Sequence, residues 1–291
     1  MILLAGRDVA RLDDGTVEVL DAVRGELGID PSTGTVRRCD LDPGSSPSPE
    51  LLDLPARRGW SAAIAAAFAS DDRSLLRAVL DDVSGAFLVS GYAPLQAGLL
   101  NMTLEEGAQS ADHQRDVCIG WAGDGAVVQL LRTTGINPVP YGPPVEPELL
   151  AESEWHPMDD LAPNAIRRVR RLDVTTTSDG GFAVEAHFRD TFRPDPSETS
   201  DPERGMHEYL VDATVDAEGH ISEIAVQPRV LPWNSCPGAV GSAQRIVGAA
   251  IRELPDVARR ELRGPTTCTH LTSTLRSLCD IDHLSARLGA T

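Results

Sequence analysis

Four side chains in the last third of the chain offer the clearest chemistry. His207, Cys236, Cys268 and His270 supply two thiols and two imidazoles. Proteins bind zinc in tetrahedral sites with thiolate and imidazole groups, and iron accepts the same groups. The sequence therefore predicts a metal site built from these four residues, with zinc as the expected ion and iron as the alternative. Their spacing is not that of a compact zinc finger, so the fold must bring them together.

Cys268 and His270 stand two positions apart at the predicted start of the last helix. Residues at i and i+2 of a regular helix point ~200° apart, so they cannot both face one ion. They can do so if Cys268 precedes the helix proper, which Gly264-Pro265 just upstream permits. We expect Cys268 at that position.

Two carboxylates are the predicted proton carriers. Glu208 follows His207 directly, and Asp190 ends the preceding predicted strand. If His207 is not the fourth ligand, the ion keeps an open position that can acidify water or polarise a carbonyl. The predicted function is then a metal-dependent enzyme that acts on a small organic molecule. Four protein ligands would instead make a closed structural site.

Two other functions remain open. A metal- or cluster-handling interaction module would bind its ion loosely and require a partner protein. A metal-free enzyme would use Cys268, whose thiol pKa a helix N-terminus lowers, with His207 or His270 as the base. Of the other cysteines, Cys118 is interpreted as part of a packed core, and Cys39 and Cys279 as structural.

The elements that must position these groups follow residue 165. Alternating apolar residues predict strands over 169–177, 182–192, 208–215 and 220–226. One apolar helical face runs from 240 to 251, a short helix from 255 to 263, and a last helix begins after Thr267 as N-cap. The predicted fold is α+β, with a four-stranded antiparallel sheet followed by three helices.

The first half of the chain predicts a mixed α/β domain. Short strands are expected at 2–4, 16–20, 35–38 and 86–89, and a hairpin at 117–121 and 126–131. Helices are expected over 60–68 and, after an N-cap at Asp71-Asp72, through Leu80. Prolines are frequent between residues 137 and 163 and disfavour regular structure. We predict an N-terminal domain over 1–140, a linker over 141–164 and the metal-site domain over 165–291.

Composition limits the partners. The formal net charge is −18, and the 26 basic residues are all arginine. This balance disfavours nucleic acids and anionic membranes, because both require basic surfaces. The absence of lysine excludes Schiff-base lysines and a P-loop lysine. With no signal peptide or long apolar run in view, we expect a cytoplasmic protein with a small-molecule substrate.

Several motifs of the C-terminal half resemble those of a bacterial family known as domain of unknown function 2889. They are Phe188-Arg189-Asp190-Thr191, Met206-His207-Glu208-Tyr209, Cys236-Pro237, Gln244-Arg245-Ile246-Val247-Gly248 and Cys268-Thr269-His270-Leu271. More distantly, residues 206–278 are similar to the NifU/IscU-type iron–sulfur scaffold fold. That likeness implies ligands near the start of a hairpin, in the following loop and at a later helix start, where His207, Cys236, Cys268 and His270 stand.

Overall fold

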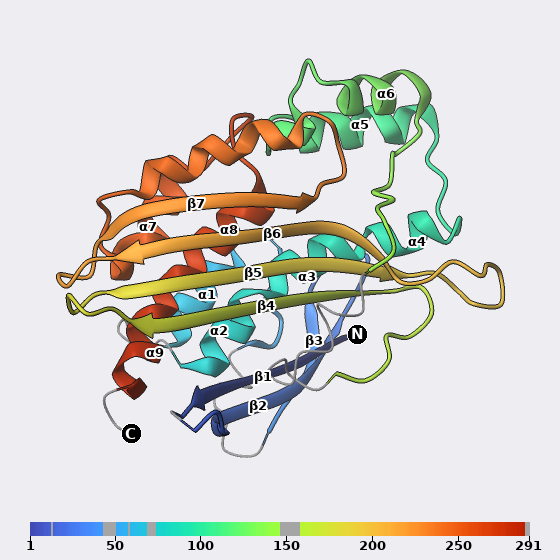
Figure 1. Cartoon of the computed structure of the whole chain (residues 1–291). Coiled ribbons are helices and arrows are strands. Elements are labelled where there is room, and N and C mark those ends of the chain that lie inside the picture. Colours follow the sequence, from blue (N-terminus) through green and yellow to red (C-terminus); the bar gives the residue numbers. More distant parts are fainter. Residues whose placement is uncertain (13, 43–50, 58, 69–73, 146–157, 289–291) are drawn as a thin grey trace. The chain divides into compact units, whose positions relative to one another are not determined.

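Two antiparallel sheets, each built from strands that follow one another along the chain, form the framework of the protein (Figure 1). The computed structural model describes residues 1–12, 14–42, 51–57, 59–68, 74–145 and 158–288. The described residues divide into two compact units. One holds those within 1–90 together with 158–159 and 282–288, and the other holds 91–145 and 160–281. The predicted linker over 141–164 lies partly outside the described residues.

The sheet of the second unit confirms the predicted four-stranded antiparallel meander. Its strands pair in the order of the sequence: β4 (Ala165–Thr176), β5 (Phe182–Arg193), β6 (Arg204–Val215) and β7 (Ile221–Val230). Alternate residues of a strand face opposite sides of a sheet. On one side, Phe188 of β5 and Tyr209 of β6 are fully buried in the main hydrophobic core. This side carries the packing that holds the sheet to its helices.

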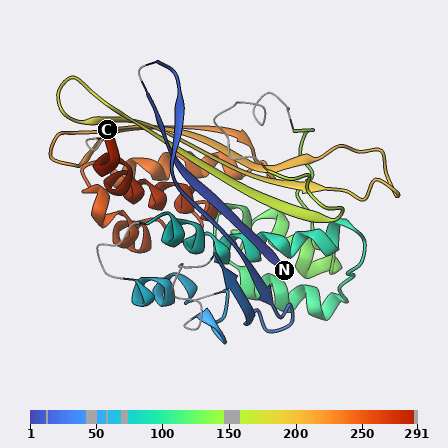
Figure 2. The same ribbon diagram turned by 90° about the horizontal axis from the view of Figure 1, so that it is seen from below.

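Helices after the sheet cover that apolar face, as predicted. Those of the second unit are η4 (Cys236–Ile246), η5 (Ile251–Glu253), α7 (Leu254–Glu261), α8 (Thr269–Ser277) and η6 (Leu278–Asp280). The chain then continues into α9 (Ile281–Leu288), whose residues 282–288 belong to the first unit. Leu254 of α7 and Leu271 of α8 are fully buried in the same core as the strands. Figure 2 shows α7 and α8 beneath the strands. Arg170 of β4 ties α8 to the sheet by donating to Ser273 Oγ at 2.9 Å.

The predicted helix over 240–251 is wrong in its extent. The chain forms the 3₁₀ helix η4 and leaves it after Ile246, and Gly248 then takes a left-handed conformation with φ of 84°. Glycine adopts that conformation without steric cost, so the apolar residues beyond it belong to a turn. Pro255 lies in the first turn of the following helix α7, which begins at Leu254, one residue before the predicted start. The last helix begins one residue later than predicted, because Cys268 rather than Thr267 is its N-cap.

The second unit also contains α4 (Tyr92–Gln96), α5 (Leu104–Gln114), η2 (Ile119–Trp121) and α6 (Ala126–Thr134). The hairpin predicted over 117–121 and 126–131 is therefore wrong. Val128 and Leu131, three positions apart, are fully buried on one side of α6. Gly135 closes that helix in the left-handed conformation. The spacing of the apolar residues is compatible with a helix as well as with a strand. Packing of one helix face in the core determines that a helix forms.

The first unit combines β1 (Ile2–Arg11), β2 (Val17–Ile29) and β3 (Val36–Leu41) with α1 (Trp60–Ala67), α2 (Leu75–Asp81) and α3 (Val83–Ser90). Leu27, Trp60 and Leu80 are fully buried in its core. The strand predicted at 86–89 is wrong, because these residues lie in α3. Ser74 is the N-cap of α2, and the predicted cap at Asp71-Asp72 lies outside the described residues.

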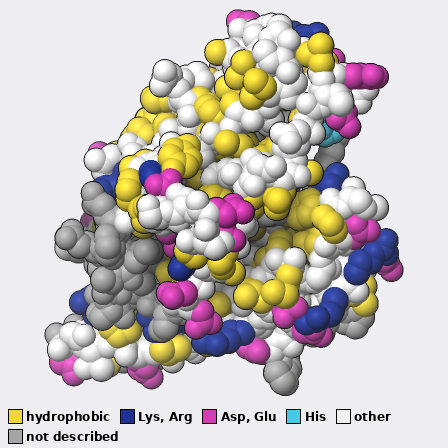
Figure 3. All heavy atoms as spheres, turned by 90° about the vertical axis from the view of Figure 1, so that its right-hand side faces the viewer, with side chains coloured by type: hydrophobic (Ala, Val, Ile, Leu, Met, Phe, Trp, Pro, Cys, Tyr) yellow, Lys and Arg dark blue, Asp and Glu magenta, His cyan; other side chains and the backbone are white. Residues whose placement is uncertain are grey.

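On the face in Figure 3, the described acidic and arginine side chains are interspersed with apolar ones. Across the described residues, no helix is both long enough and apolar enough to cross a bilayer.

Candidate metal site

Asp190 and His207 lie opposite each other where β5 ends and β6 begins. They are paired in register, and their side chains share the apolar face of the sheet with Phe188 and Tyr209. The register shifts directly after this pair, which leaves Met206 as an extra residue in β6. Such bulges re-aim side chains and are frequent beside active sites. The sheet therefore directs a carboxylate and an imidazole at the same point.

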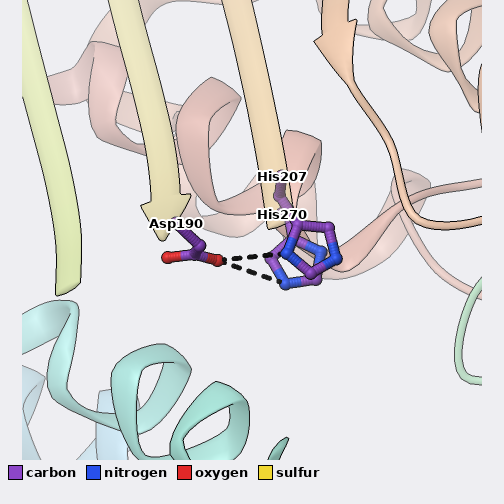
Figure 4. A group of neighbouring side chains, drawn as sticks. All are labelled: Asp190, His207 and His270. Atoms are coloured by element: carbon purple, nitrogen blue, oxygen red, sulfur yellow. Dashed lines mark ion pairs between the residues drawn. The ribbon is translucent and has the colours of Figure 1, made fainter. Parts of the chain in front are cut away.

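His270 completes this group from the first turn of α8. Its Nε2 lies 3.6 Å from Asp190 Oδ2, and His207 Nδ1 lies 3.4 Å from the same oxygen. The two imidazoles are stacked, with centroids 3.6 Å apart and an angle of 19° between the planes. Figure 4 shows the carboxylate directed at both rings. Among the described residues, this is the group of three His, Cys, Asp or Glu side chains whose ligand atoms all lie within 4.8 Å of one another.

Asp190 is fully buried and ionised because Arg168 holds it. The guanidinium donates from Nε to Oδ1 at 2.8 Å and from Nη2 to Oδ2 at 2.9 Å. Burial acts to raise the pKa of Asp190, but the positive charge of Arg168 opposes it, and the pKa falls below its ordinary value of 3.8. Arg168 stands opposite Asp190 in β4 and also lies over the ring of Phe188. The bidentate pair fixes the orientation of the carboxylate.

His270 is held neutral. Burial lowers its pKa well below the ordinary value of 6.5, and the neighbouring His207 lowers it further. Its Nδ1 lies 3.8 Å from Cys268 Sγ. As the sequence predicts, Cys268 precedes the regular helix, with an extended backbone of φ −124° and ψ 129°. The neutral imidazole thus presents Nε2 to Asp190 and Nδ1 to a thiol, and neutral imidazole is the form that binds metals.

His207 Nδ1 has no hydrogen bond. The side chain is buried, and the geometry toward Asp190 does not meet that of a hydrogen bond in spite of the 3.4 Å separation. A buried polar atom without a partner costs roughly 1–3 kcal/mol. In native proteins such an atom often marks a water or an ion.

Glu208 lies on the opposite face of the sheet from this group. It accepts a hydrogen bond from Arg189 Nη2 at 2.8 Å and lies 3.0 Å from His187 Nε2. Burial acts to raise the pKa of Glu208, but His187 and Arg189 outweigh it and lower the pKa from 4.5 to about 2. Adjacent residues of a strand point to opposite faces, which separates Glu208 from His207.

The structure thus brings together three of the six predicted site residues: Asp190, His207 and His270. Cys268 contacts Nδ1 of His270, the ring nitrogen that does not face Asp190, and Cys236 lies outside the group. Asp190 was predicted as a proton carrier and stands instead among the potential ligands. Sequence reasoning missed Arg168. The signal for it is the alternation of β4, in which Arg168 shares a face with Leu172 and Val174.

Residues 166–283 match the family model described as protein of unknown function, DUF2889. The resemblance seen in the sequence motifs is confirmed. No curated protein and no solved structure matches the chain. The DUF2889 region contains Arg168, Asp190, His207 and His270, whereas Cys118 lies outside it.

A surface concavity of about 610 Å³ occurs elsewhere on the DUF2889 region. It is lined mainly by the outward side chains of the sheet, including Glu185, Asp212 and Glu223. None of the three clustered residues lines it. We give it no part in the site, because exposed acidic side chains on a twisted sheet are ordinary solvated surface.

Proposed function

We propose that the DUF2889 region is a metal-dependent enzyme domain whose ion is bound by Asp190, His207 and His270. Zinc is the first choice and iron the alternative, since two imidazoles and one carboxylate suit both. The observation that carries the proposal is the buried, unpartnered Nδ1 of His207, 3.4 Å from a carboxylate oxygen. Ligand atoms in a tetrahedral site with bonds of ~2.1 Å are ~3.4 Å apart. The separations of 3.4 and 3.6 Å agree with that spacing.

Three protein ligands leave at least one position open. A metal ion there would acidify water or polarise a carbonyl. Arg168 keeps the Asp190 carboxylate in one orientation, and the Cys268 thiol contacts the far nitrogen of His270. Partners of this kind fix ring orientation and tune ligand strength. In this proposal Asp190 acts as a ligand, and Glu208, on the other face, has a structural role.

Charge favours an anionic substrate. The charges of Asp190 and Arg168 cancel, so a divalent ion bound with two neutral imidazoles leaves a net charge of about +2 in a buried place. An unbalanced buried charge is costly. A small organic molecule bearing a carboxylate or another anionic oxygen would reduce that charge at the open position. We therefore propose this class of substrate.

The other two functions have weaker support. Burial raises the pKa of Cys268 above its ordinary value of 9.0, which opposes the thiolate that metal-free cysteine catalysis needs. The interaction module stays a prediction, as does the likeness to the NifU/IscU-type fold. The interaction-module hypothesis differs from the enzyme hypothesis because it predicts rapid exchange of the ion with a chelator. Slow exchange from the wild-type protein would count against it.

Metal analysis of untagged protein purified without metal resin tests the site. We expect about one equivalent of zinc or iron, and at least a tenfold weaker affinity in Asp190→Asn and in His207→Gln. His187→Gln is the matched control, because His187 is a buried histidine of the same sheet on the opposite face. Equal metal content in the wild type, Asp190→Asn and His207→Gln would overturn the proposal.

Relaxation measurements on the cobalt-loaded protein test the substrate class. Acetate is the probe, and its proton signals should broaden when the carboxylate occupies the open position. Acetamide, which has the same shape without the charge, should broaden much less. Equal broadening by both molecules would contradict the anionic substrate but leave the metal site intact.

A further inference from the structure

A second cluster of charged side chains lies on the face of the DUF2889 sheet opposite the candidate metal site. Arg189 of β5, Glu208 of β6 and Arg229 of β7 come from three neighbouring strands (Figure 1). Arg189 and Glu208 are paired in register. The register of β6 and β7 shifts beside Glu208 and leaves Arg229 as an extra residue in β7. Such a bulge re-aims a side chain, and the guanidinium of Arg229 approaches Glu208.

One oxygen of Glu208 is the point where this cluster meets. Its Oε1 accepts a hydrogen bond from Arg189 Nη2 at 2.8 Å. The same oxygen lies 3.0 Å from His187 Nε2 and 3.4 Å from Arg229 Nε. Within the part of the chain that the structure describes, neither arginine has an ion pair with another carboxylate. Both arginines therefore share a single acidic partner.

Arg189 has donors that this partner does not use. Its side chain is only 3% exposed, yet its Nε and Nη1 have no hydrogen-bond partner. These two nitrogens carry most of the N–H groups of a guanidinium. Buried polar groups in native proteins are almost always hydrogen-bonded, and an exception often marks an ion or a ligand. The missing partner must be an acceptor, because a guanidinium only donates.

The charges of the cluster indicate what this acceptor is. At pH 8, where histidine is ordinarily neutral, Arg189 and Arg229 face the single negative charge of Glu208. One positive charge is left over in a largely buried place, and a buried charge needs a counterion. A singly charged anion balances it, and a planar carboxylate matches the geometry of a guanidinium. Arg229, whose side chain is 37% exposed, marks the side of the cluster that is open to solvent.

We propose that Arg189 and Arg229 form a binding site for the carboxylate of a small organic acid. The carboxylate enters beside Arg229 and accepts hydrogen bonds from the unpartnered nitrogens of Arg189. Glu208 holds the Arg189 guanidinium in place through Nη2. The site lies on the other face of the sheet from Asp190 and His207, so this acid is a second ligand and not the substrate of the proposed enzyme. Its binding requires no metal ion.

Nuclear magnetic resonance of arginine side chains in ¹⁵N-labelled wild-type protein tests the site at pH 8. Burial protects the Nε–H of Arg189 from exchange with water, and Arg189→Lys identifies its signal by removing it. Sodium acetate should shift this signal in a saturable way, whereas sodium chloride at the same ionic strength should not. No shift with acetate, or an equal shift with chloride, would overturn the proposal. Tighter binding of inorganic phosphate than of acetate would overturn the assignment to a carboxylate.

Acetate binding to variants, followed by the backbone amide signals around Glu208, tests the two arginines. Arg189→Lys keeps the positive charge and a donor for Glu208 but loses the guanidinium, so the affinity should fall by about tenfold or more. Arg229→Gln should weaken binding severalfold. Arg171→Lys is the matched control, because Arg171 lies on the same face and already pairs with two carboxylates of its own. Equal affinity in the wild type, Arg189→Lys and Arg229→Gln would contradict the proposal.

This site and the candidate metal site can fail independently. His207→Gln, which should lose the metal, should still bind acetate at Arg189 as tightly as the wild type does. Broadening of the acetate signals requires cobalt, whereas the shift of the Arg189 signal does not. If the wild type contains no metal but the Arg189 signal responds to acetate, the metal proposal fails and the carboxylate site stands. If metal is bound and the Arg189 signal does not respond, the reverse holds.

Discussion

At the scale of single residues, the site depends on which positive groups balance the charge of a buried carboxylate. Asp190 is fully buried and paired with Arg168, whose side chain is 6% exposed. Two imidazole nitrogens face the same carboxylate without the geometry of hydrogen bonds. An ion between them would add a second positive partner to Asp190. The charge of Arg168 and that of a metal ion therefore compete, and this competition can be measured.

Removing Arg168 should expose that competition. In the apo protein, Arg168→Met leaves Asp190 buried and unpaired, which should lower the free energy of unfolding by about 3–5 kcal/mol. Added zinc should restore more stability to this variant than to the wild type, because the ion replaces the missing charge. Urea unfolding with and without zinc measures both effects. Arg171→Met is the control, since Arg171 pairs with half-exposed carboxylates, and it should cost less than 1 kcal/mol. Equal losses in both variants would contradict this account.

Glu208 should make stability depend on pH. Its pKa is about 2 in the folded protein and 4.5 ordinarily, so the unfolded chain binds the proton more readily. The stabilisation is therefore complete above pH 4.5 and is lost as the pH falls toward 2. Glu208→Gln should be about 1–3 kcal/mol less stable than the wild type at pH 7, and the difference should shrink below pH 4.5. Unfolding by urea between pH 7 and 3.5 checks this. A difference that stays constant over that range would refute it.

At the scale of elements, the second half of the chain is far more predictable than the first. The sequences of β5 and β6 alternate apolar residues, such as Val184, Ala186 and Phe188, and the turns of the two hairpins carry Asp-Gly-Gly and Glu-Gly. The strands predicted at residues 86–89 and 117–131 were wrong, because short apolar runs fit either a strand or a helix. Packing against other elements determines which of the two forms. The sequence places Asp190 and His207 near the ends of two consecutive strands, and the register of β5 and β6 in the structure pairs them. Their meeting with His270 depends on where α8 docks, and no local pattern encodes that.

The pair of helices α5 and α6 illustrates such a packing constraint. A Cβ on Gly107 would lie 2.5 Å from Gly135 Cα and 2.9 Å from Leu131 O, and backbone atoms cannot move aside easily. Gly107→Ala should therefore destabilise the protein by about 1–3 kcal/mol, although alanine is the better helix former. Thermal unfolding measures the change. Gly241→Ala, where no atom lies within 4 Å of the added Cβ, should be neutral. A stabilised Gly107→Ala variant would show that helix propensity outweighs the contact.

At the scale of the whole molecule, the compact units do not follow the order of the chain. The first unit takes in both chain ends, because residues 282–288 join the N-terminal strands. The predicted boundaries at 140 and 164 treat each unit as one continuous stretch. Proline content marks irregular backbone, but it carries no information on which partners the segments on either side choose. The link between α9 and β1 is a contact between residues 275 positions apart.

That link should support the stability of the first unit. His283 Nε2 lies 2.8 Å from Oδ2 of Asp8, which is 7% exposed. His283→Ala leaves this carboxylate with Arg287 at 3.8 Å, so the free energy of unfolding should fall by about 1–3 kcal/mol. Amide exchange in β1 should accelerate, because α9 no longer holds the strand. Asp282→Ala, an exposed change in the same helix, should cost only a few tenths. With Asp8→Asn, a double-mutant cycle should give a coupling of about 0.5–3 kcal/mol. A coupling near zero would mean that the chain ends meet without stabilising each other.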